Sequence, residues 1–213
     1  MITLPVYETK LPIENKALEF TPLVVKEEKA IAAAKDTGKK EDSYRTFLKI
    51  LADKINFPVV NLCETDLIHL ILEMRKRSIG ETVKFSFNCP QTKEPISIEI
   101  NCNDIKLKGS NKTELIKVGG YAIHLQVPKK KSQLWSAIKS IQTQSEKISF
   151  DDMSDDQKED LLHSLPIIIK NEIELACDNL LHYEYTISYR SGESDRTLSL
   201  RSAEDFFTLF FAM

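Results

Sequence analysis

The chain has 213 residues, of which 42% are hydrophobic and 29% charged, and its net charge is −3. This length suffices for one large or two small domains with a buried core. The nearly balanced charge gives no overall attraction to nucleic acid or to an anionic membrane, and no apolar run approaches the roughly 18 residues of a membrane span. The opening residues, MITLPVYETKLPIE, lack the basic start and apolar stretch of a signal peptide. Composition therefore predicts a soluble, intracellular globular protein.

The first third of the chain is expected to form a short hairpin followed by three helices. Strands are predicted at residues 6–11 and 17–21, where prolines confine them to an edge, and helices at residues 24–35, 42–55 and 65–77. The third helix is apolar over most of its circumference, and its last turn carries Arg75, Lys76 and Arg77, which suits the helix dipole. We therefore expect it to be the central core helix.

The middle of the chain has the alternation of antiparallel hairpins. Strands are expected at residues 83–88 and 96–101, with Cys89 at the turn between them, and at residues 114–118 and 121–127. Gly119 and Gly120 join the second pair, and two glycines accept the positive φ angles of a tight hairpin. Each strand has one apolar and one polar face, so the hairpins are expected to cover a core on one side.

The last third of the chain is expected to contain further helices and one more hairpin. Leu134, Ile138 and Ile141 share one face of a helix predicted at residues 133–144. Ser154 is expected to cap a short helix that ends before Pro166, and an apolar pattern continues over residues 167–177. The remaining elements are strands at residues 183–189 and 197–200 and a final helix that Ser202 and Asp205 begin with a capping box.

These elements predict an α+β fold, with antiparallel hairpins packed against five to six helices. We expect one domain over residues 1–213, because the apolar helix at residues 65–77 needs the hairpin sheets to cover it. The alternative is a subdivision into a helical part, residues 1–80, and a hairpin-rich part, residues 81–213, that ends in the aromatic helix.

The cysteines are the candidate metal ligands, but their spacing does not fit a metal site. A structural zinc site needs four S or N ligands in close pairs, whereas Thr92 stands three residues after Cys89 and Leu180 stands three after Cys177. We therefore interpret Cys89/Thr92 and Cys177/Leu180 as equivalent positions of two ribbon-like hairpins that hold no metal. A zinc site pooled from Cys89, Cys102, Cys177 and His182 is the less favoured alternative to buried, apolar cysteines.

No pattern of catalytic residues emerges. The chain has no G-x-S-x-G elbow and no glycine-rich phosphate loop. Its four histidines are isolated, and His69 lies within the apolar helix, which favours a structural role. The basic runs at residues 75–77 and 129–131 are interpreted as solvated charge. We therefore expect no enzyme activity, catalytic residue, metal, cofactor or small-molecule substrate.

The C-terminus is the candidate partner-binding segment. Its last eight residues contain four phenylalanines, Phe206, Phe207, Phe210 and Phe211. One interpretation is that the aromatic helix docks onto the core of this chain. The other is that part of its aromatic face inserts into a partner subunit, because exposed aromatic clusters mark interaction sites.

Four stretches in order resemble the baseplate hub assembly family of T4-like contractile-tailed phages. They are LPVYETKLP with FTPLVVKEEKAI; TDLIHLILEMRKRSIGETVKFSFNC; IKLKGSNKTELIKVGGYAIHLQVP; and SLPIIIKNEIELACDNL with the later LRSAEDFF. The resemblance covers nearly the whole chain. It departs at the ribbon tips, where family members often carry C-x-x-C pairs and this chain has Thr92 and Leu180 in the second positions. Any metal of the relatives is therefore not carried over.

The resemblance implies a non-enzymatic hub assembly protein, either an assembly chaperone or a hub component. Its partners would be other hub and tail proteins, with no nucleic acid or membrane involved. It would act in the cytoplasm of the infected bacterium during assembly or remain in the baseplate of the virion tail. The alternative is a nucleic-acid-binding or regulatory module derived from a zinc ribbon, which the acidic stretch at residues 151–160 disfavours.

Overall fold

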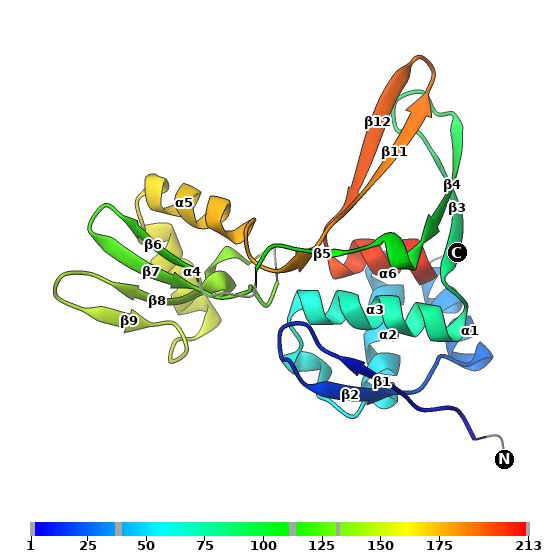
Figure 1. Ribbon diagram of the computed structural model, residues 1–213, viewed down its shortest axis with the longest axis horizontal. Helices are drawn as coiled ribbons and strands as arrows, with labels where there is room; N and C mark the ends of the chain where they lie inside the picture. The colour runs from blue at the N-terminus through cyan, green and yellow to red at the C-terminus, as the bar shows by residue number, and fades with distance from the viewer. Residues whose placement is uncertain (1–2, 37–39, 111–113, 131–132, 212–213) are drawn as a thin grey trace. The chain divides into compact units, whose positions relative to one another are not determined.

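The computed structural model describes residues 3–36, 40–110, 114–130 and 133–211 (Figure 1). The helices of this part are α1 (Val25–Lys35), α2 (Lys40–Lys54), α3 (Glu64–Ser78), α4 (Asp155–Ser164), α5 (Ile167–Cys177) and α6 (Ala203–Phe211). The strands are β1 (Tyr7–Lys10), β2 (Ala17–Phe20), β3 (Thr82–Asn88), β4 (Pro95–Asn101), β5 (Leu107–Lys108), β6 (Leu115–Val118), β7 (Tyr121–Leu125), β8 (Ile138–Gln142), β9 (Lys147–Ser149), β10 (His182–Tyr183), β11 (Tyr185–Ser191) and β12 (Ser194–Leu200). All paired strands of the larger hairpins run antiparallel. The predicted α+β class is confirmed.

The chain divides into two compact units. Unit 1 consists of Met1–Leu62, Asp66–Lys106 and Tyr183–Met213, and unit 2 of Cys63–Thr65 and Leu107–His182. This division does not fall at residue 80, where the sequence suggested a subdivision. Whether the two units unfold together as the single predicted domain stays a prediction.

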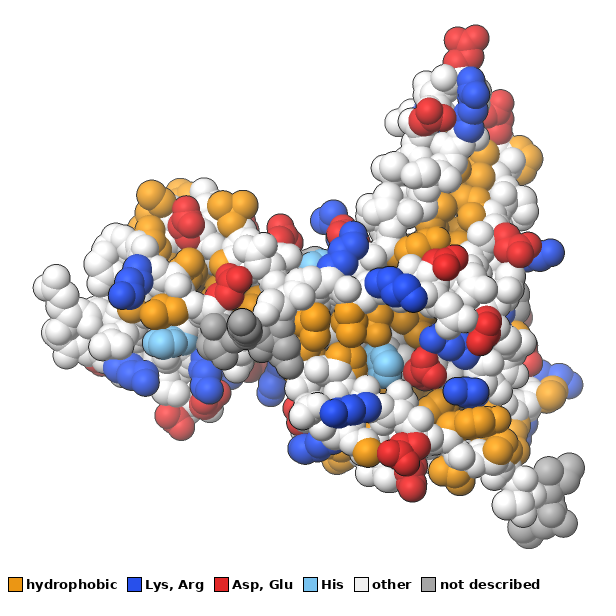
Figure 2. All heavy atoms as spheres, in the orientation of Figure 1, with side chains coloured by type: hydrophobic (Ala, Val, Ile, Leu, Met, Phe, Trp, Pro, Cys, Tyr) orange, Lys and Arg blue, Asp and Glu red, His pale blue; other side chains and the backbone are white. Residues whose placement is uncertain are grey.

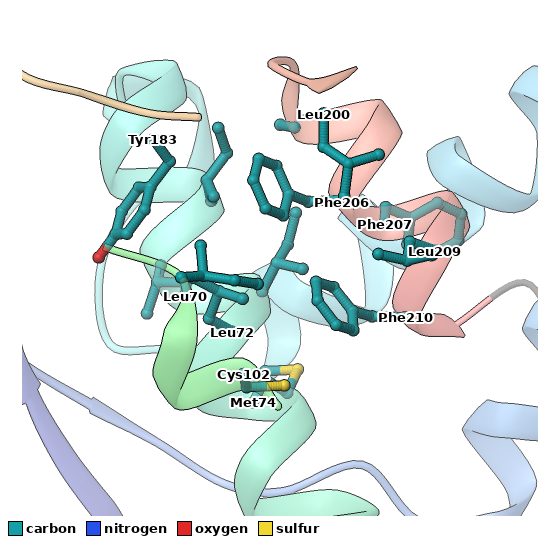
Figure 3. Packing of buried hydrophobic residues seen from close by; sticks show 14 of the residues in the cluster. Leu70, Leu72, Met74, Cys102, Tyr183, Leu200, Phe206, Phe207, Leu209 and Phe210 are labelled. Carbon is teal, nitrogen blue, oxygen red and sulfur yellow. The ribbon is translucent and has the colours of Figure 1, made fainter. Parts of the chain in front are cut away.

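The core of unit 1 is built around α3, as its sequence predicts. Ile68, Leu70, Ile71 and Met74 are almost wholly buried on this helix. Figure 3 shows Phe206 and Phe210 of α6 pointing toward Leu70, Leu72 and Met74 of α3. A helix that is apolar on nearly all sides is stable in water only when other elements cover it, and the two ends of the chain supply that cover.

Two polar contacts attach the β1–β2 hairpin to α3. The carboxylate of Asp66 is fully buried and accepts hydrogen bonds from the backbone N–H groups of Ile13, at 2.8 Å, and Glu14, at 3.2 Å. One helical turn further on, the Nε2 of His69 lies 2.7 Å from the Thr9 hydroxyl, and its Nδ1 lies 2.9 Å from the hydroxyl of Tyr183. Both ring nitrogens of His69 thus have hydrogen-bond partners within the fold, as expected of a structural histidine.

Two long hairpins of unit 1 extend side by side from its helices (Figure 1). β3 pairs with β4 from Thr82↔Asn101 to Asn88↔Pro95, and β11 pairs with β12 from Tyr185↔Leu200 to Ser191↔Ser194. Aromatic rings pack between them, since Phe87 of β3 meets Tyr189 of β11 edge to face with the ring centroids 5.1 Å apart. The hairpins therefore belong to one structural element although about 100 residues separate them in sequence.

Unit 2 contains a four-stranded antiparallel sheet in the order β6-β7-β8-β9. Gly119 and Gly120 form the turn between β6 and β7 with φ angles of 57° and 84°, which confirms the predicted tight hairpin. The helix predicted at residues 133–144 is wrong, because this segment is a short 3-10 turn, Leu134–Ala137, followed by β8.

A β-bulge explains why residues 133–144 imitate a helix. Ile141 pairs with Ile123 and Ile138 pairs with Leu125, and the register shifts between His124 and Leu125. Regular alternation would put Ile138 and Ile141 on opposite faces of the strand, but one extra residue restores them to the same side. The resulting spacing of three is the spacing of a helical face.

Helices α4 and α5 complete unit 2. Ser154 begins α4 with the predicted cap, since the Gln157 backbone N–H donates to its hydroxyl at 3.3 Å and the Gln157 side chain accepts from the Ser154 backbone N–H. Ile169 and Ile173 of α5 are buried in the core of this unit, together with Trp135, Ile138 and Ile141. The amphipathic α5 therefore covers the sheet with one face.

The two ends of the Leu107–His182 segment lie next to each other. β5 pairs with β10, and just inside them Ser110 forms a parallel bridge with Leu180. Gly109 has a φ of 83°, and a Cβ atom at this position would stand 2.3 Å from the carbonyl oxygen of Leu180. Only glycine permits this close approach, so Gly109 fixes how the segment is closed.

Candidate functional site

The turn between β3 and β4 places Cys89 and Thr92 at the tip of a hairpin, as the sequence suggested. The Cys89 backbone N–H donates to the Glu94 carbonyl at 2.8 Å, and the Lys93 backbone N–H donates to the Cys89 carbonyl at 2.9 Å. Lys93 has a φ of 62°, a left-handed conformation that is uncommon for a residue with a side chain. The turn thus points the side chains of Cys89, Thr92 and Glu94 toward the neighbouring hairpin.

Ser191, at the tip of the β11–β12 hairpin, receives these side chains. Its hydroxyl lies 2.5 Å from the Thr92 hydroxyl and donates to the Glu94 carboxylate at 2.9 Å, while Thr92 also donates to the same carboxylate oxygen at 3.1 Å. We call Cys89, Thr92, Glu94 and Ser191 the tip junction. Cys89 and Ser191 are buried there, whereas Thr92 and Glu94 lie at the surface.

Hydrogen-bond donors in the tip junction favour the charged form of either Cys89 or Glu94, which share the Ser191 and Thr92 hydroxyl groups. Donation from the Ser191 hydroxyl, followed by the backbone amide and hydroxyl of Thr92, lowers the pKa of Cys89 to about 6. Donation from Ser191 and then Thr92 also holds the pKa of Glu94 below its usual value. Burial, together with the hydrogen bond to Cys89, raises the pKa of the adjacent Tyr189.

Cys177 and Leu180 do not form a second hairpin tip, and this part of the ribbon interpretation is wrong. Cys177 is the last residue of α5, and the Leu180 N–H donates to its carbonyl at 3.2 Å in the turn that follows. Leu180 is a core residue of unit 2. A helix ends here because Ile169, Ile173 and Ala176 repeat with helical spacing.

Ser191 and its neighbour across the turn, Ser194, are not among the site residues predicted from the sequence. These two residues have the same spacing of three as Cys89 and Thr92 and flank Gly192, whose φ is 60°. The signal was the SGES stretch between two alternating strands. Small polar residues such as these form a hairpin tip as readily as cysteine does, but they are far commoner in any sequence.

The described ranges contain neither a candidate metal site nor a candidate membrane span. Among residues 3–36, 40–110, 114–130 and 133–211, no three His, Cys, Asp or Glu side chains gather as a metal site would require. Within the same ranges, no helix has the length and apolar character needed to cross a membrane. Polar side chains that are distant in sequence meet at the tip junction and around His69.

The four phenylalanines near the C-terminus lie in or against the core of unit 1. Phe206, Phe207 and Phe210 are almost completely buried, and Phe207 packs on Phe47 of α2 with a ring-centroid distance of 4.9 Å. Phe211 is half-buried and stacks on the same Phe47 ring at 5.2 Å. These contacts favour the interpretation that α6 docks onto its own core. Contact of the four rings with a partner stays a prediction.

The interpretation of the basic run at the end of α3 as solvated charge is wrong for Arg75. Arg75 is 3% exposed, and its guanidinium donates to the carbonyl oxygens of Gly80 and Thr82, so that it ties the end of α3 to the start of β3. Lys131 of the other basic run lies outside the described residues. On the face drawn in Figure 2, basic and acidic side chains are interspersed and do not gather by sign. This face offers no continuous positive surface for a phosphate backbone.

The fold and the tip junction define an α+β protein whose hairpins are fastened by its own polar side chains. The family model described as T4 bacteriophage base plate protein matches residues 4–208. The chain therefore belongs to this family, which confirms the resemblance to T4-like baseplate proteins. It is a structural phage baseplate protein and contacts other phage tail proteins. A search of curated proteins and a search of solved structures each found no match.

Proposed function

We propose that this chain assembles the central hub of the phage baseplate through protein–protein contacts, without enzymatic activity. The observation that carries the proposal is the family match over residues 4–208, to which the ordered resemblance to hub assembly proteins adds the subtype. The chain acts as a hub component or as a chaperone that leaves after assembly. Its partners are other hub and tail proteins.

Exposed apolar side chains on α5 support a role in protein contacts. Ile167, Ile168 and Leu175 are 77%, 61% and 64% exposed. On the same helix Lys170 and Glu174 form an ion pair at 3.4 Å, so these two charges balance each other. Ile168 and Leu175 are seven residues apart and therefore share one face of α5, and contiguous exposed aliphatic side chains are typical of a surface that another protein covers.

The proposal also assigns a place of action. The chain works in the cytoplasm of the infected bacterium while the tail is built and, as a hub component, stays in the baseplate of the virion. No nucleic acid, membrane, cofactor or small-molecule substrate takes part in this role.

Mass spectrometry of purified phage particles, combined with a pull-down of the tagged full-length chain from infected cells, tests the proposal. Capture from uninfected cells serves as the control for non-specific binding. Hub proteins in the pull-down together with the chain in particles indicate a hub component, and capture without the chain in particles indicates a chaperone. Absence from both, or salt-dependent binding to DNA in place of capture, would overturn the proposal.

A further inference from the structure

We infer that the tip junction is a latch that holds the β3–β4 and β11–β12 hairpins together as one rigid arm, and that the latch closes only while Glu94 is ionised. The inference concerns the arm itself and does not depend on the proposed hub role. It rests on the contacts that Thr92, Glu94 and Ser191 make across the two tips.

The β3–β4 and β11–β12 hairpins are far apart in sequence and form separate sheets, so side-chain contacts have to hold them together. Each hairpin is a two-stranded sheet without a third strand, and an isolated hairpin is marginally stable in water. At the far end of the arm, the side-chain contacts across the hairpins among the described residues include those of the tip junction, the contacts of Tyr189 with Phe87 and Cys89, and the hydrogen bond from Arg196 to Gln91. Of these, the junction alone brings a carboxylate and two hydroxyl groups together.

The proton inventory of the junction explains why Glu94 has to be charged. Thr92 and Ser191 each have one hydroxyl proton, and both donate to the same carboxylate oxygen of Glu94. Bonds of this kind are strong because the acceptor is ionised. Protonation of Glu94 removes the negative charge, and with it the charge assistance of both hydrogen bonds.

The charged and titratable groups near Glu94 either favour its ionised form or compete with it for hydrogen-bond donors. Arg196 of β12 favours the ionised carboxylate by its positive charge. Cys89 of its own hairpin draws on the same two hydroxyl groups, and Tyr189 of β11 places its hydroxyl 4.0 Å from the Cys89 sulfur. A folded-state pKa of Glu94 below the ordinary 4.5 means that the stabilisation is complete above pH 4.5 and is lost as the pH falls through the folded-state pKa.

Amide hydrogen exchange of the full-length chain tests the role of Glu94. In Glu94→Gln at pH 7, peptides covering residues 88–95 and 188–196 should lose protection by at least about ten-fold, the factor expected when one charge-assisted hydrogen bond is lost. Glu99→Gln is the matched control, because Glu99 lies on the same hairpin and pairs only with the exposed Lys84 in the contacts described. Wild-type protection in Glu94→Gln, or an equal loss in Glu99→Gln, would overturn the inference.

A cross-link tests the proximity of the two tips independently. Ser191→Cys puts a second thiol beside Cys89, and diamide should join them in a disulfide as it accepts the two electrons and two protons that the thiols release. Ser97→Cys on β4 is the control, since Ser97 pairs with Ser86 away from the tip. Cross-linking in Ser191→Cys at least about ten-fold faster than in Ser97→Cys is expected from the higher effective concentration, and equal rates would show that the tips are not held together.

Discussion

The two units build their cores from different parts of the chain and from different kinds of side chain. Unit 1 draws on three segments from the beginning, the middle and the end of the chain, whereas unit 2 is almost entirely the continuous segment Leu107–His182. Unit 1 fills its core with phenylalanines from α2 and α6 against an apolar α3, and unit 2 uses aliphatic side chains and Trp135 between a sheet and α5. Local contacts close before distant ones, so unit 2 should be the less dependent on the rest of the chain.

Deletion of residues 206–213 should have the largest effect on stability, because it should unfold unit 1 while unit 2 stays folded. Each of Phe206, Phe207 and Phe210 is worth about 3–5 kcal/mol when truncated to alanine, so their joint loss is comparable to the whole stability of a domain, roughly 5–15 kcal/mol. Unit 1 should therefore unfold. The single tryptophan of the chain, Trp135, lies in unit 2 and should retain its cooperative fluorescence transition.

The same experiment tests the prediction of a single domain. Loss of the Trp135 transition in the truncated chain would show that unit 2 depends on unit 1 and would support one domain over residues 1–213. A truncated chain that keeps its full circular dichroism spectrum and loses only partner binding would instead support the partner role of the phenylalanines.

Two substitutions on α5 should differ strongly although they lie two residues apart. Ile173 is fully buried, so Ile173→Ala should destabilise unit 2 by about 2–5 kcal/mol in urea unfolding followed by Trp135 fluorescence. Leu175 is 64% exposed, so Leu175→Ala should change the stability by no more than about 0.5 kcal/mol. Similar effects of both would mean that α5 does not face the sheet as described.

The helix caps offer a smaller, matched comparison between the units. Ser154 caps α4 in unit 2 through the Gln157 N–H, and Ser202 caps α6 in unit 1 through the Asp205 N–H at 3.1 Å. Replacement of either serine by alanine should cost about 1 kcal/mol. Trp135 lies in unit 2, so its fluorescence transition in urea should shift more in Ser154→Ala than in Ser202→Ala. Circular dichroism reports on the helices of both units and should respond to both variants. Equal sensitivity of both probes to both variants would indicate that the units unfold together.

Acid should weaken unit 1 through His69 by the smallest margin of this series. Burial lowers the pKa of His69 below 6.5, so the folded state binds fewer protons than the unfolded state. The stability that depends on neutral His69 is complete above pH 6.5 and is lost as the pH falls from there toward the folded-state pKa. His69→Gln should reduce the loss of urea stability between pH 7.5 and 5.5, and His163→Gln, at an exposed position of α4, should not.

The sequence predicts most elements whose period is undisturbed. The alternation of residues 83–88 and 96–101, the two glycines at residues 119–120 and the apolar α3 all depend on local rules and are confirmed. The segment at residues 133–144 fails because its strand contains a bulge, and a bulge is set by the pairing partner rather than by the strand itself. Tertiary pairing thus overrides a local pattern here.

The site was harder to predict than the fold. Cys89 and Thr92 could be placed at a hairpin tip from their own strand pattern, but their partner could not, because Ser191 is 99 residues from Thr92. A hydroxyl group, an oxygen acceptor and a tight turn are common in any sequence. Cys177 was predicted to lie in a ribbon only because it is a cysteine. The helical spacing of the apolar residues before it places it at the end of α5.

The pairing of β5 with β10 bears on how this chain can change in length over evolution. Leu107 begins β5 and His182 begins β10, and these two strands pair. The segment between them therefore starts and finishes within about 5 Å, the spacing of adjacent strands. Insertions, deletions or exchange of the whole segment for a short turn would leave the ends of the remaining chain at the same separation. Natural variation in size among relatives should therefore accumulate between these two strands, while the N- and C-terminal segments stay constant in length.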